Sequence, residues 1–392
     1  MSSQEDIRLG HFSFMEMVVE LVERAGQRLL LWPGIPAGYE IRLLPTDAPG
    51  NYRVIGGPAH GAVASLPQDE NGKITAIEVG GFTLTRCAPP ADERGLAGYR
   101  HIAPAMTPDA ARDKAFADLW QQLKSQADGA EFVYTLPYPK HQFLRFLEGE
   151  ETVIFHGSGD HDIAEFVPRR DSIELNDETG RGNKMAIYGT HDAIWPLFFA
   201  IVDRPNLRGS IRNGVDYFHN EAGEQIAAYH FSVNQEQLAE RPYREGMLYI
   251  LPRETFERLQ HAPGVFANEW ASEAPVRPIA RLRVQPEDFP FLEQIAGHDD
   301  SALLEGARLQ GQVMAAVTAA WSEEERLILA LTWDEALQGV IVPFINAQRA
   351  VMPAASYALS FPAGAGPVTL TITGPPAYLA IIRQRLGDRL RG

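Results

Sequence analysis

The chain has 392 residues, of which 45% are apolar and 22% charged. These fractions are close to the averages of soluble globular proteins, so disorder, collagen and coiled coil are excluded as descriptions of the whole chain. Its 51 acidic and 35 basic side chains leave a net charge of −16, which opposes binding to nucleic acid or anionic lipid except in a locally basic cleft.

We expect the protein to be cytoplasmic, of bacterial type and without a membrane partner. Glu5 and Asp6 stand where a signal peptide carries lysine or arginine. No apolar run reaches the roughly 18–20 residues that span a bilayer. The single cysteine, Cys87, excludes an internal disulfide and a cysteine-built zinc site, and we expect it to be a small buried apolar group.

Residues 1–100 are predicted to form a small α+β accessory unit. Ser13 is the expected N-cap of a helix over 14–22, where apolar residues recur at helical spacing. Strand-like runs bounded by turn residues follow at 39–44, 52–55, 74–79 and 82–85. The glycines of this region lack the strand–GxGxxG–helix context of a dinucleotide-binding loop, so we assign it no catalytic role.

Residues 101–130 are predicted to hold a connecting helix. Thr107 is the expected N-cap, Pro108 takes the first helical position, and Asp109 lies in the first turn. The apolar stripe of this helix comprises Ala111, Ala115, Phe116, Leu119, Trp120 and Leu123. Such a stripe indicates a packing element.

Residues 131–297 and 298–392 are predicted to form two further units. In the first, strands are expected at 152–156, 185–190, 227–233, 247–251, 266–272 and 279–284, and helices at 141–147, 192–202 and 253–259. In the second, a helical pattern runs from 300 to 337, strands follow at 356–362 and 368–373, and a helix begins after Gly374-Pro375-Pro376. Runs of strands with few long helices indicate an α+β fold with antiparallel or mixed sheets.

Three segments of the middle region contain the residues that suggest a chemical function. They are His156-Gly157-Ser158 at the end of an apolar strand, Tyr188 within a second strand, and Asn268-Glu269-Trp270 within a third. Each segment alone is typical of ordinary core or surface structure.

In this order and spacing, the three segments resemble the His-Tyr-Glu signature of the ADP-ribosyltransferase fold, in its poly(ADP-ribose) polymerase-like branch. His156 precedes Tyr188 by 32 residues, and Tyr188 precedes Glu269 by 81. The helix predicted at 141–147 matches the lead-in to the first strand in that family. The likeness covers residues 132–295, under half of the chain, and implies a split β-sheet core that takes NAD as its substrate and needs no metal.

By this resemblance, four residues would hold the nicotinamide of NAD. The Gly157 backbone would pair with the carboxamide, where a residue without Cβ permits close approach, and Ser158 would add a hydrogen bond. Tyr188 would stack on the ring, and Phe199 stands where the family has a second stacking aromatic. Phe199 replaces the tyrosine usual in the polymerases, which keeps a stacking face and loses a hydroxyl.

The resemblance assigns two further residues to the ribose. His156 would hydrogen-bond a ribose hydroxyl. Glu269 would hydrogen-bond the 2′-hydroxyl of the nicotinamide ribose and stabilise the oxocarbenium-like transition state. Glu273 competes for this role, because even offsets along a strand point to the same face. The Asn-Glu-aromatic motif favours Glu269, with Trp270 as the aromatic.

The resemblance therefore implies an ADP-ribosyltransferase, a glycosyltransferase that cleaves the nicotinamide–ribose bond and passes ADP-ribose to an unknown protein, nucleic acid or small-molecule acceptor. Four alternatives remain: an NAD glycohydrolase on the same fold, a non-catalytic module that binds NAD or ADP-ribose, a metal-dependent hydrolase built on His156 and His161, and purely structural segments. Asp160 and Asp162 extend that metal pattern only weakly. Arg169 and Arg170 fit either a pyrophosphate or surface ion pairs.

Overall fold

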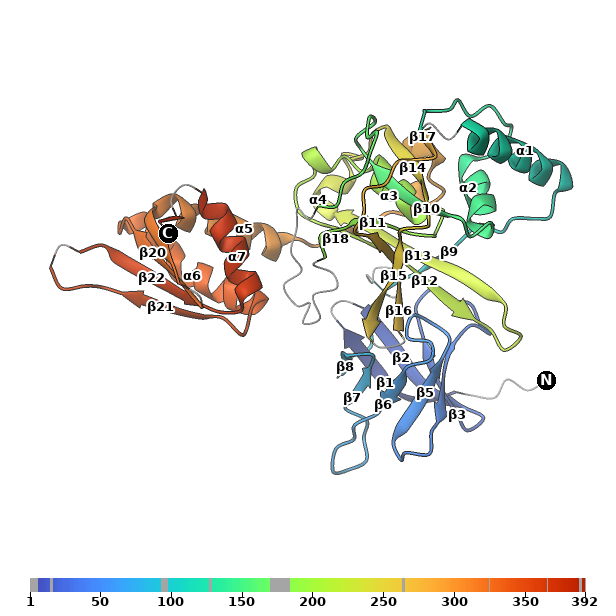
Figure 1. The fold of residues 1–392 in the computed structure, drawn as a ribbon. Helices are drawn as coiled ribbons and strands as arrows, with labels where there is room; N and C mark the ends of the chain where they lie inside the picture. The colour runs from blue at the N-terminus through green and yellow to red at the C-terminus, as the bar shows by residue number, and fades with distance from the viewer. Residues whose placement is uncertain are drawn as a thin grey trace. The chain divides into compact units, whose positions relative to one another are not determined.

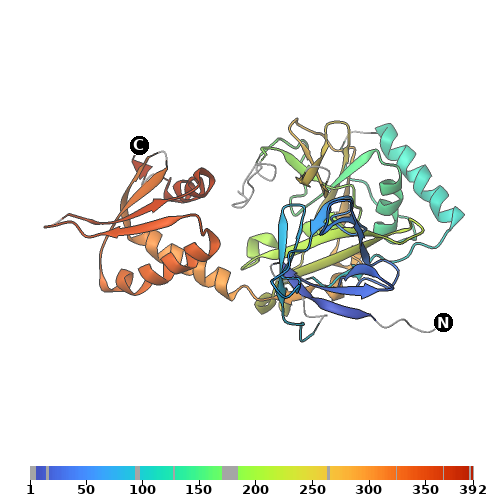
Figure 2. The ribbon, with the colours of Figure 1, turned by 90° about the horizontal axis from the view of Figure 1, so that it is seen from below.

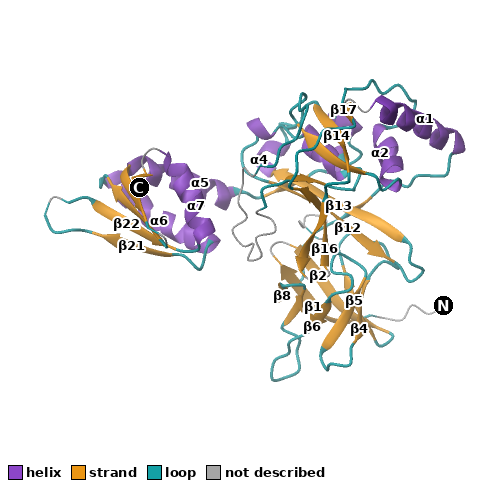
Figure 3. Ribbon diagram, in the orientation of Figure 1, coloured by secondary structure: helices purple, strands orange, loops and turns teal. Residues whose placement is uncertain are grey.

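The computed structural model describes residues 6–14, 17–92, 98–126, 129–169, 184–262, 265–323, 325–364, 366–387 and 390–391. This part of the chain is mixed α+β, mostly sheet with few helices (Figure 3). Its residues up to His298, Lys184 aside, form one compact unit, and a second unit begins at Asp299. No helix among the described residues is both long and apolar enough to cross a membrane.

The N-terminal residues form a closed antiparallel barrel of eight strands, drawn in blue shades in Figures 1 and 2. Consecutive strands pair, and β1 pairs with β8 through His11 and Cys87, so that closure removes the sheet edges. The strands are β1 (Ile7–Phe14), β2 (Met17–Arg24), β3 (Gln27–Leu31), β4 (Ile41–Pro45), β5 (Asn51–Ile55), β6 (Val63–Ser65), β7 (Ala76–Val79) and β8 (Phe82–Cys87). Phe12, Leu21 and Leu43 belong to its buried core.

The helix predicted over 14–22 is wrong, and the N-terminal unit is therefore a barrel and not an α+β unit. Residues 17–24 form β2, which pairs with β1 on one side and β3 on the other. Val19 and Val22 are buried in this strand, and β-branched residues favour strands. Pairing on both sides outweighs a local helical periodicity. The four strands predicted in this region correspond to β4, β5, β7 and β8, and Cys87 is half-buried.

The connecting segment contains β9 (His101–Ile102) and helix α1 (Ala110–Gln126). The predicted N-cap is shifted by two residues: the Asp109 carboxylate, and not Thr107, accepts hydrogen bonds from the Ala111 and Arg112 N–H groups at 3.0 Å each. Within the predicted apolar stripe, the residues that become buried are Phe116, Trp120 and Leu123. The helix therefore begins where a side chain can satisfy its free N–H groups.

The middle region contains three small sheets, with strand orders β10-β14-β17, β11-β16-β15 and β12-β13-β18; β9 also pairs with β13. Its strands are β10 (Val153–Ser158), β11 (Ile187–Gly189), β12 (Ile211–His219), β13 (Gln225–Asn234), β14 (Gly246–Pro252), β15 (Glu257–Ala262), β16 (Val265–Ser272), β17 (Ala280–Val284) and β18 (Ala296–His298). Its α-helices are α2 (Lys140–Gly149), α3 (Trp195–Ile201) and α4 (Gln235–Leu238), and short 3₁₀ turns lie at Arg204–Asn206, Pro286–Asp288 and Leu292–Gln294.

The six strands predicted in this region are confirmed as β10, β11, β13, β14, β16 and β17. The helix predicted at 141–147 lies within α2, and the one predicted at 192–202 contains α3. The helix predicted over 253–259 is wrong. Glu257 pairs with Ala271 in a β15–β16 hairpin, and the Arg253 guanidinium stacks on the Trp270 ring. These contacts are non-local, so the local sequence pattern does not report them.

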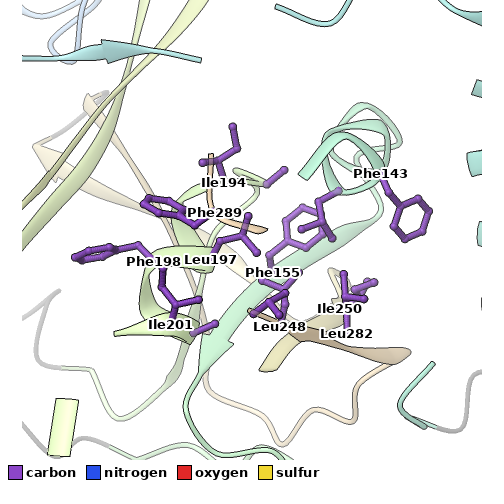
Figure 4. Packing of buried hydrophobic residues seen from close by; sticks show 14 of the residues in the cluster. Phe143, Phe155, Ile194, Leu197, Phe198, Ile201, Leu248, Ile250, Leu282 and Phe289 are labelled. Carbon is purple, nitrogen blue, oxygen red and sulfur yellow. The ribbon is translucent and has the colours of Figure 1, made fainter. Parts of the chain in front are cut away.

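One apolar core joins these elements. Phe155 of β10 is enclosed by Leu197 and Phe198 of α3, by Leu248 and Ile250 of β14, and by α2 (Figure 4). The hairpin β12–β13 also reaches the barrel, because Phe218 and Ala228 belong to the barrel's buried core. The barrel and the three sheets therefore share packing within the first unit.

The C-terminal unit is a five-stranded sheet of order β21-β22-β20-β19-β23 with helices on one face, drawn in orange and red in Figure 1. Its elements are α5 (Ser301–Ala316), β19 (Val317–Ser322), β20 (Arg326–Leu331), α6 (Glu335–Val351), β21 (Ser356–Ser360), β22 (Val368–Thr373), α7 (Pro376–Leu386) and β23 (Leu390–Arg391). The prediction of helix from 300 to 337 is wrong in its second half, where β19 and β20 pair with each other. The later strands and the last helix are confirmed.

Candidate functional site

Strands β10 and β11 meet at one pair of residues and then separate. Phe155 and Thr190 exchange two backbone hydrogen bonds, of 2.8 and 3.0 Å. On its other edge β10 pairs with β14, where Val153 faces Pro252. Backbone groups alternate between the two edges of a strand, so Gly157, like Phe155, directs its N–H and C=O toward β11. Continuing the register would place Gly157 opposite Tyr188.

The side chain of His156 occupies the place where that next backbone pair would form. Its Nδ1 lies 2.7 Å from the Tyr188 carbonyl oxygen. Because a carbonyl only accepts, Nδ1 carries the proton and Nε2 has a free lone pair. Burial lowers the pKa of His156, so the ring is neutral. Phe166 packs edge-on against it with ring centroids 4.8 Å apart.

Gly157 lets helix α3 lie directly against β10. A Cβ at this position would overlap the Pro196 carbonyl oxygen and would lie 2.9 Å from the Ala200 nitrogen. Its peptide groups, in contrast, face the gap between the strands. Ser158 ends β10, and its hydroxyl accepts a hydrogen bond from the Asp160 N–H at 3.1 Å.

Tyr188 and Glu269 lie on the same face of the β11–β16 ladder. Tyr188 pairs with Ala271, and Glu269 is two residues from Ala271 along β16. Such diagonal neighbours lie roughly 7–8 Å apart, with their Cβ atoms somewhat closer. The strand ends at Ser272, so Glu273 lies outside it and the shared face expected for Glu273 and Glu269 is not formed.

Phe199 belongs to α3, the helix that covers Gly157. Its ring is half-buried and contacts Trp195 and Phe198 at centroid distances of 6.1 and 6.2 Å. The Arg204 guanidinium lies over it at 5.4 Å. Arg204 has no counterpart among the sequence predictions.

A buried carboxylate fixes the start of α3. Asp192 accepts hydrogen bonds from the Ile194 and Trp195 N–H groups, at 2.9 and 2.6 Å, and from the Tyr217 and Tyr229 hydroxyls, at 3.0 and 2.6 Å. Glu148, at the end of α2, interacts with the same Tyr217 hydroxyl. Burial and the nearby Asp192 raise the pKa of Glu148 to about 8. Glu148 is therefore a protonated acid at neutral pH.

Glu148 and Glu269 both line a cleft of about 1260 Å³ that extends to the barrel at Gly57 and His60. The structure thus brings His156, Gly157 and Tyr188 together at the separation of β10 and β11. Glu269 lines the cleft from β16, whereas Glu273 does not, and none of the other predicted NAD-binding residues lines it.

Sequence reasoning missed most residues of this cleft. Glu148 stands five residues before the start of β10, yet only the fold buries it beside Asp192. The local pattern around Arg253 and Arg258 predicts a helix, which the structure does not form. The His230 imidazole packs over Gly214 of the neighbouring strand β12. A local sequence pattern carries no signal for any of these contacts.

The metal site considered from the sequence, built on His156 and His161, finds little support in the contacts of these residues. Among the described residues, no group of three or more His, Cys, Asp or Glu side chains is placed to hold a metal ion. The His161 Nε2 lies 3.4 Å from the Glu245 carbonyl oxygen. The backbone of Arg169 forms an isolated antiparallel β-bridge with that of Ala186. Arg170 lies outside the described residues.

Comparison of the chain with protein-family models, with curated proteins and with solved structures finds no match. The function is therefore argued from the geometry of the site.

Proposed function

We propose that the protein is an NAD-dependent ADP-ribosyltransferase with a split-sheet core formed by β10-β14-β17 and β11-β16-β15. The observation that carries the proposal is the gap after the Phe155–Thr190 pair. There Gly157 directs one N–H and one C=O away from β14. A primary carboxamide, such as that of nicotinamide, presents the complementary acceptor and donor.

The residues around this gap match the remaining parts of NAD. The free Nε2 of neutral His156 accepts a hydrogen bond from a ribose hydroxyl. Tyr188 offers an aromatic face on the side of the ladder that also carries Glu269. A carboxylate there stabilises positive charge that develops on the ribose as the bond to nicotinamide breaks.

In this reaction the nicotinamide leaves as a neutral ring with both electrons of the broken C–N bond. A nucleophilic atom of the acceptor forms the new bond to the same ribose carbon, and its proton passes to a base or to solvent. The cleft beside Glu269 is open to an acceptor. Because Glu269 is exposed, water also reaches it, and NAD hydrolysis is the second candidate.

The proposal can be tested by incubating the purified protein with NAD. Mass spectrometry then measures the free nicotinamide released and any acceptor whose mass has increased. We expect nicotinamide release by the wild type. Glu269→Gln keeps the size of the side chain and loses its charge, so release slows by about 10²–10³-fold while NAD affinity changes little. Glu273→Gln is the matched control and retains most activity.

Four other outcomes would change the assignment. Free ADP-ribose without any labelled acceptor identifies a glycohydrolase. NAD binding without nicotinamide release identifies a binding module. Loss of activity in Glu273→Gln but not in Glu269→Gln shows that the catalytic acid was misassigned by four residues. Loss of activity with a chelator favours the metal-dependent alternative.

A further inference from the structure

The cleft lined by Glu269 contains three arginines that have no carboxylate partner among the described residues. Arg145 donates to the Pro104 carbonyl, and Arg253 donates to the Glu151 carbonyl at 2.8 Å. Arg258 donates to the Ala267 carbonyl at 2.7 Å and to the Asn268 side-chain oxygen at 3.1 Å. All these acceptors are neutral, so the positive charges remain available to an anionic ligand.

Among the described residues, none of the acidic side chains that line the cleft forms an ion pair with these three arginines. Asp192 accepts four hydrogen bonds, and Asp216 pairs with Arg100 at 2.8 Å. Glu148 is protonated, for the reasons given above. Glu151 and Glu269 also line the cleft, so four carboxylates, Asp192 and Asp216 included, match its four arginines, and the cleft is close to neutral in a chain of net charge −16.

Aromatic rings accompany two of these arginines. The Arg253 guanidinium lies 4.5 Å from the centroid of Trp270, and Arg258 lies 5.4 Å from that of Phe266. Phe266 is 47% exposed. An exposed ring beside a planar cation offers a stacking surface to a flat heterocycle.

Three histidines that line the cleft each have one imidazole nitrogen without a hydrogen-bond partner among the described residues. These nitrogens are His191 Nε2, His219 Nδ1 and His230 Nδ1, all buried. Burial lowers the pKa of His230 well below its usual value and also lowers that of His191, so both rings are neutral. Buried polar atoms are normally paired, and unpaired ones in a cleft indicate groups that a ligand satisfies.

We propose that this cleft is a second ligand site, which binds a free nucleotide with its phosphate at Arg253 and Arg258 and its base on the exposed aromatic face. The polar edge of the base reaches the unpaired imidazoles. A net charge of −16 repels a polyanion at long range but is a small obstacle to one phosphate group. The charges therefore favour a free nucleotide over a nucleic acid strand.

Binding at this site does not depend on NAD chemistry. The role of the nucleotide as the ADP-ribose acceptor does rest on the proposed function, because Glu269 lines the same cleft. Failure of nicotinamide release would remove the acceptor role and leave the binding site standing. Failure of nucleotide binding would leave NAD cleavage standing.

Isothermal titration of the full-length protein with guanosine 5′-monophosphate tests the proposal. We expect saturable binding, with guanosine and ribose 5-phosphate each at least tenfold weaker because each lacks one recognised part. Arg253→Gln and Arg258→Gln should each weaken binding about tenfold, a typical loss for one charge-assisted contact. Arg241→Gln is the matched control, since Arg241 is exposed, pairs with Glu293 and lies outside the cleft.

Thermal melting of each variant separates lost binding from lost folding. Absence of binding, or equal affinity in the wild type and the three arginine variants, overturns the proposal.

Other ligands can also overturn it. Competitive displacement of the monophosphate by NAD, measured in Glu269→Gln to prevent turnover, assigns the cleft to NAD and overturns a second site. A single-stranded oligonucleotide that binds more than tenfold tighter than the monophosphate, with the same dependence on Arg253 and Arg258, overturns the free nucleotide in favour of a strand. An acidic peptide that binds tighter overturns nucleotide recognition altogether.

Discussion

The Nδ1 atom of His156 and the backbone carbonyl oxygen of Tyr188 lie 2.7 Å apart, although 32 residues separate them in the chain. This hydrogen bond stands where β10 and β11 would otherwise continue their ladder. It fixes the tautomer of the imidazole and leaves Nε2 as an acceptor. The same contact therefore holds the two strands in place and prepares the ring for a hydroxyl.

Substitution of His156 by asparagine separates these two roles. The asparagine NH₂ group can replace Nδ1–H toward Tyr188, whereas nothing replaces Nε2. We expect a melting temperature close to that of the wild type and NAD binding weaker by about 2- to 10-fold, the value of one net hydrogen bond. Calorimetry measures the NAD affinity, and thermal melting measures the stability. Unchanged NAD affinity would remove His156 from the binding site.

Tyr188 is expected to stack on the nicotinamide ring. Replacement by alanine removes an aromatic face worth about 0.5–1.5 kcal/mol beyond area burial, so NAD affinity should fall by roughly tenfold. Tyr188→Phe keeps the ring and should have a mild effect. Equal NAD affinity in the wild type and Tyr188→Ala would refute the stacking role.

Gly157 is expected to tolerate no side chain. A Cβ there meets the backbone of α3 at Pro196 and Ala200, and such overpacking typically costs about 1–3 kcal/mol. Gly157→Ala should therefore lower the free energy of unfolding, measured by urea denaturation. Gly149→Ala is the control, because a Cβ at this last residue of α2 meets no atom within 4 Å. Similar stability of the two variants would contradict the close approach of α3 to β10.

The raised pKa of Glu148 predicts how the stability of the folded protein depends on pH. Burial and the neighbouring Asp192 raise its pKa from 4.5 to about 8, so the folded protein holds this proton more tightly than the unfolded chain. The contribution of Glu148 to stability is complete below about 4.5, falls as the pH rises toward about 8, and is lost above that value. Glu148→Gln imitates the protonated acid and cannot ionise.

Thermal melting at about pH 5 and about pH 9 measures this linkage. We expect the difference between the two melting temperatures to shrink in Glu148→Gln. The exposed Glu257→Gln serves as a control and should keep the wild-type difference. A wild-type difference in both variants would show that Glu148 is not the titrating group.

The sequence was informative where local patterns and tertiary structure agree. The short apolar runs of β10 and β14 and the alternating Ala280–Val284 segment of β17 are local patterns typical of strands, and the structure buries their apolar side chains in the first unit. The local pattern also predicts strands that contain Tyr188 and Glu269, and the pairing of β11 with β16 puts these two residues on one face. The helices α1 and α2 were recognisable because their apolar residues face one side.

Only the tertiary structure decided the features that depend on distant partners. Met17–Arg24 has a helical spacing of apolar residues, yet its pairing with β1 and β3 makes it a strand of a closed barrel. Glu257–Ala262 becomes a strand because β16 pairs with it. The proton on Glu148, the unpaired nitrogen of His230 and the arginines of the cleft follow from which groups the fold brings together and which it removes from water. Local periodicity encodes neither desolvation nor long-range pairing.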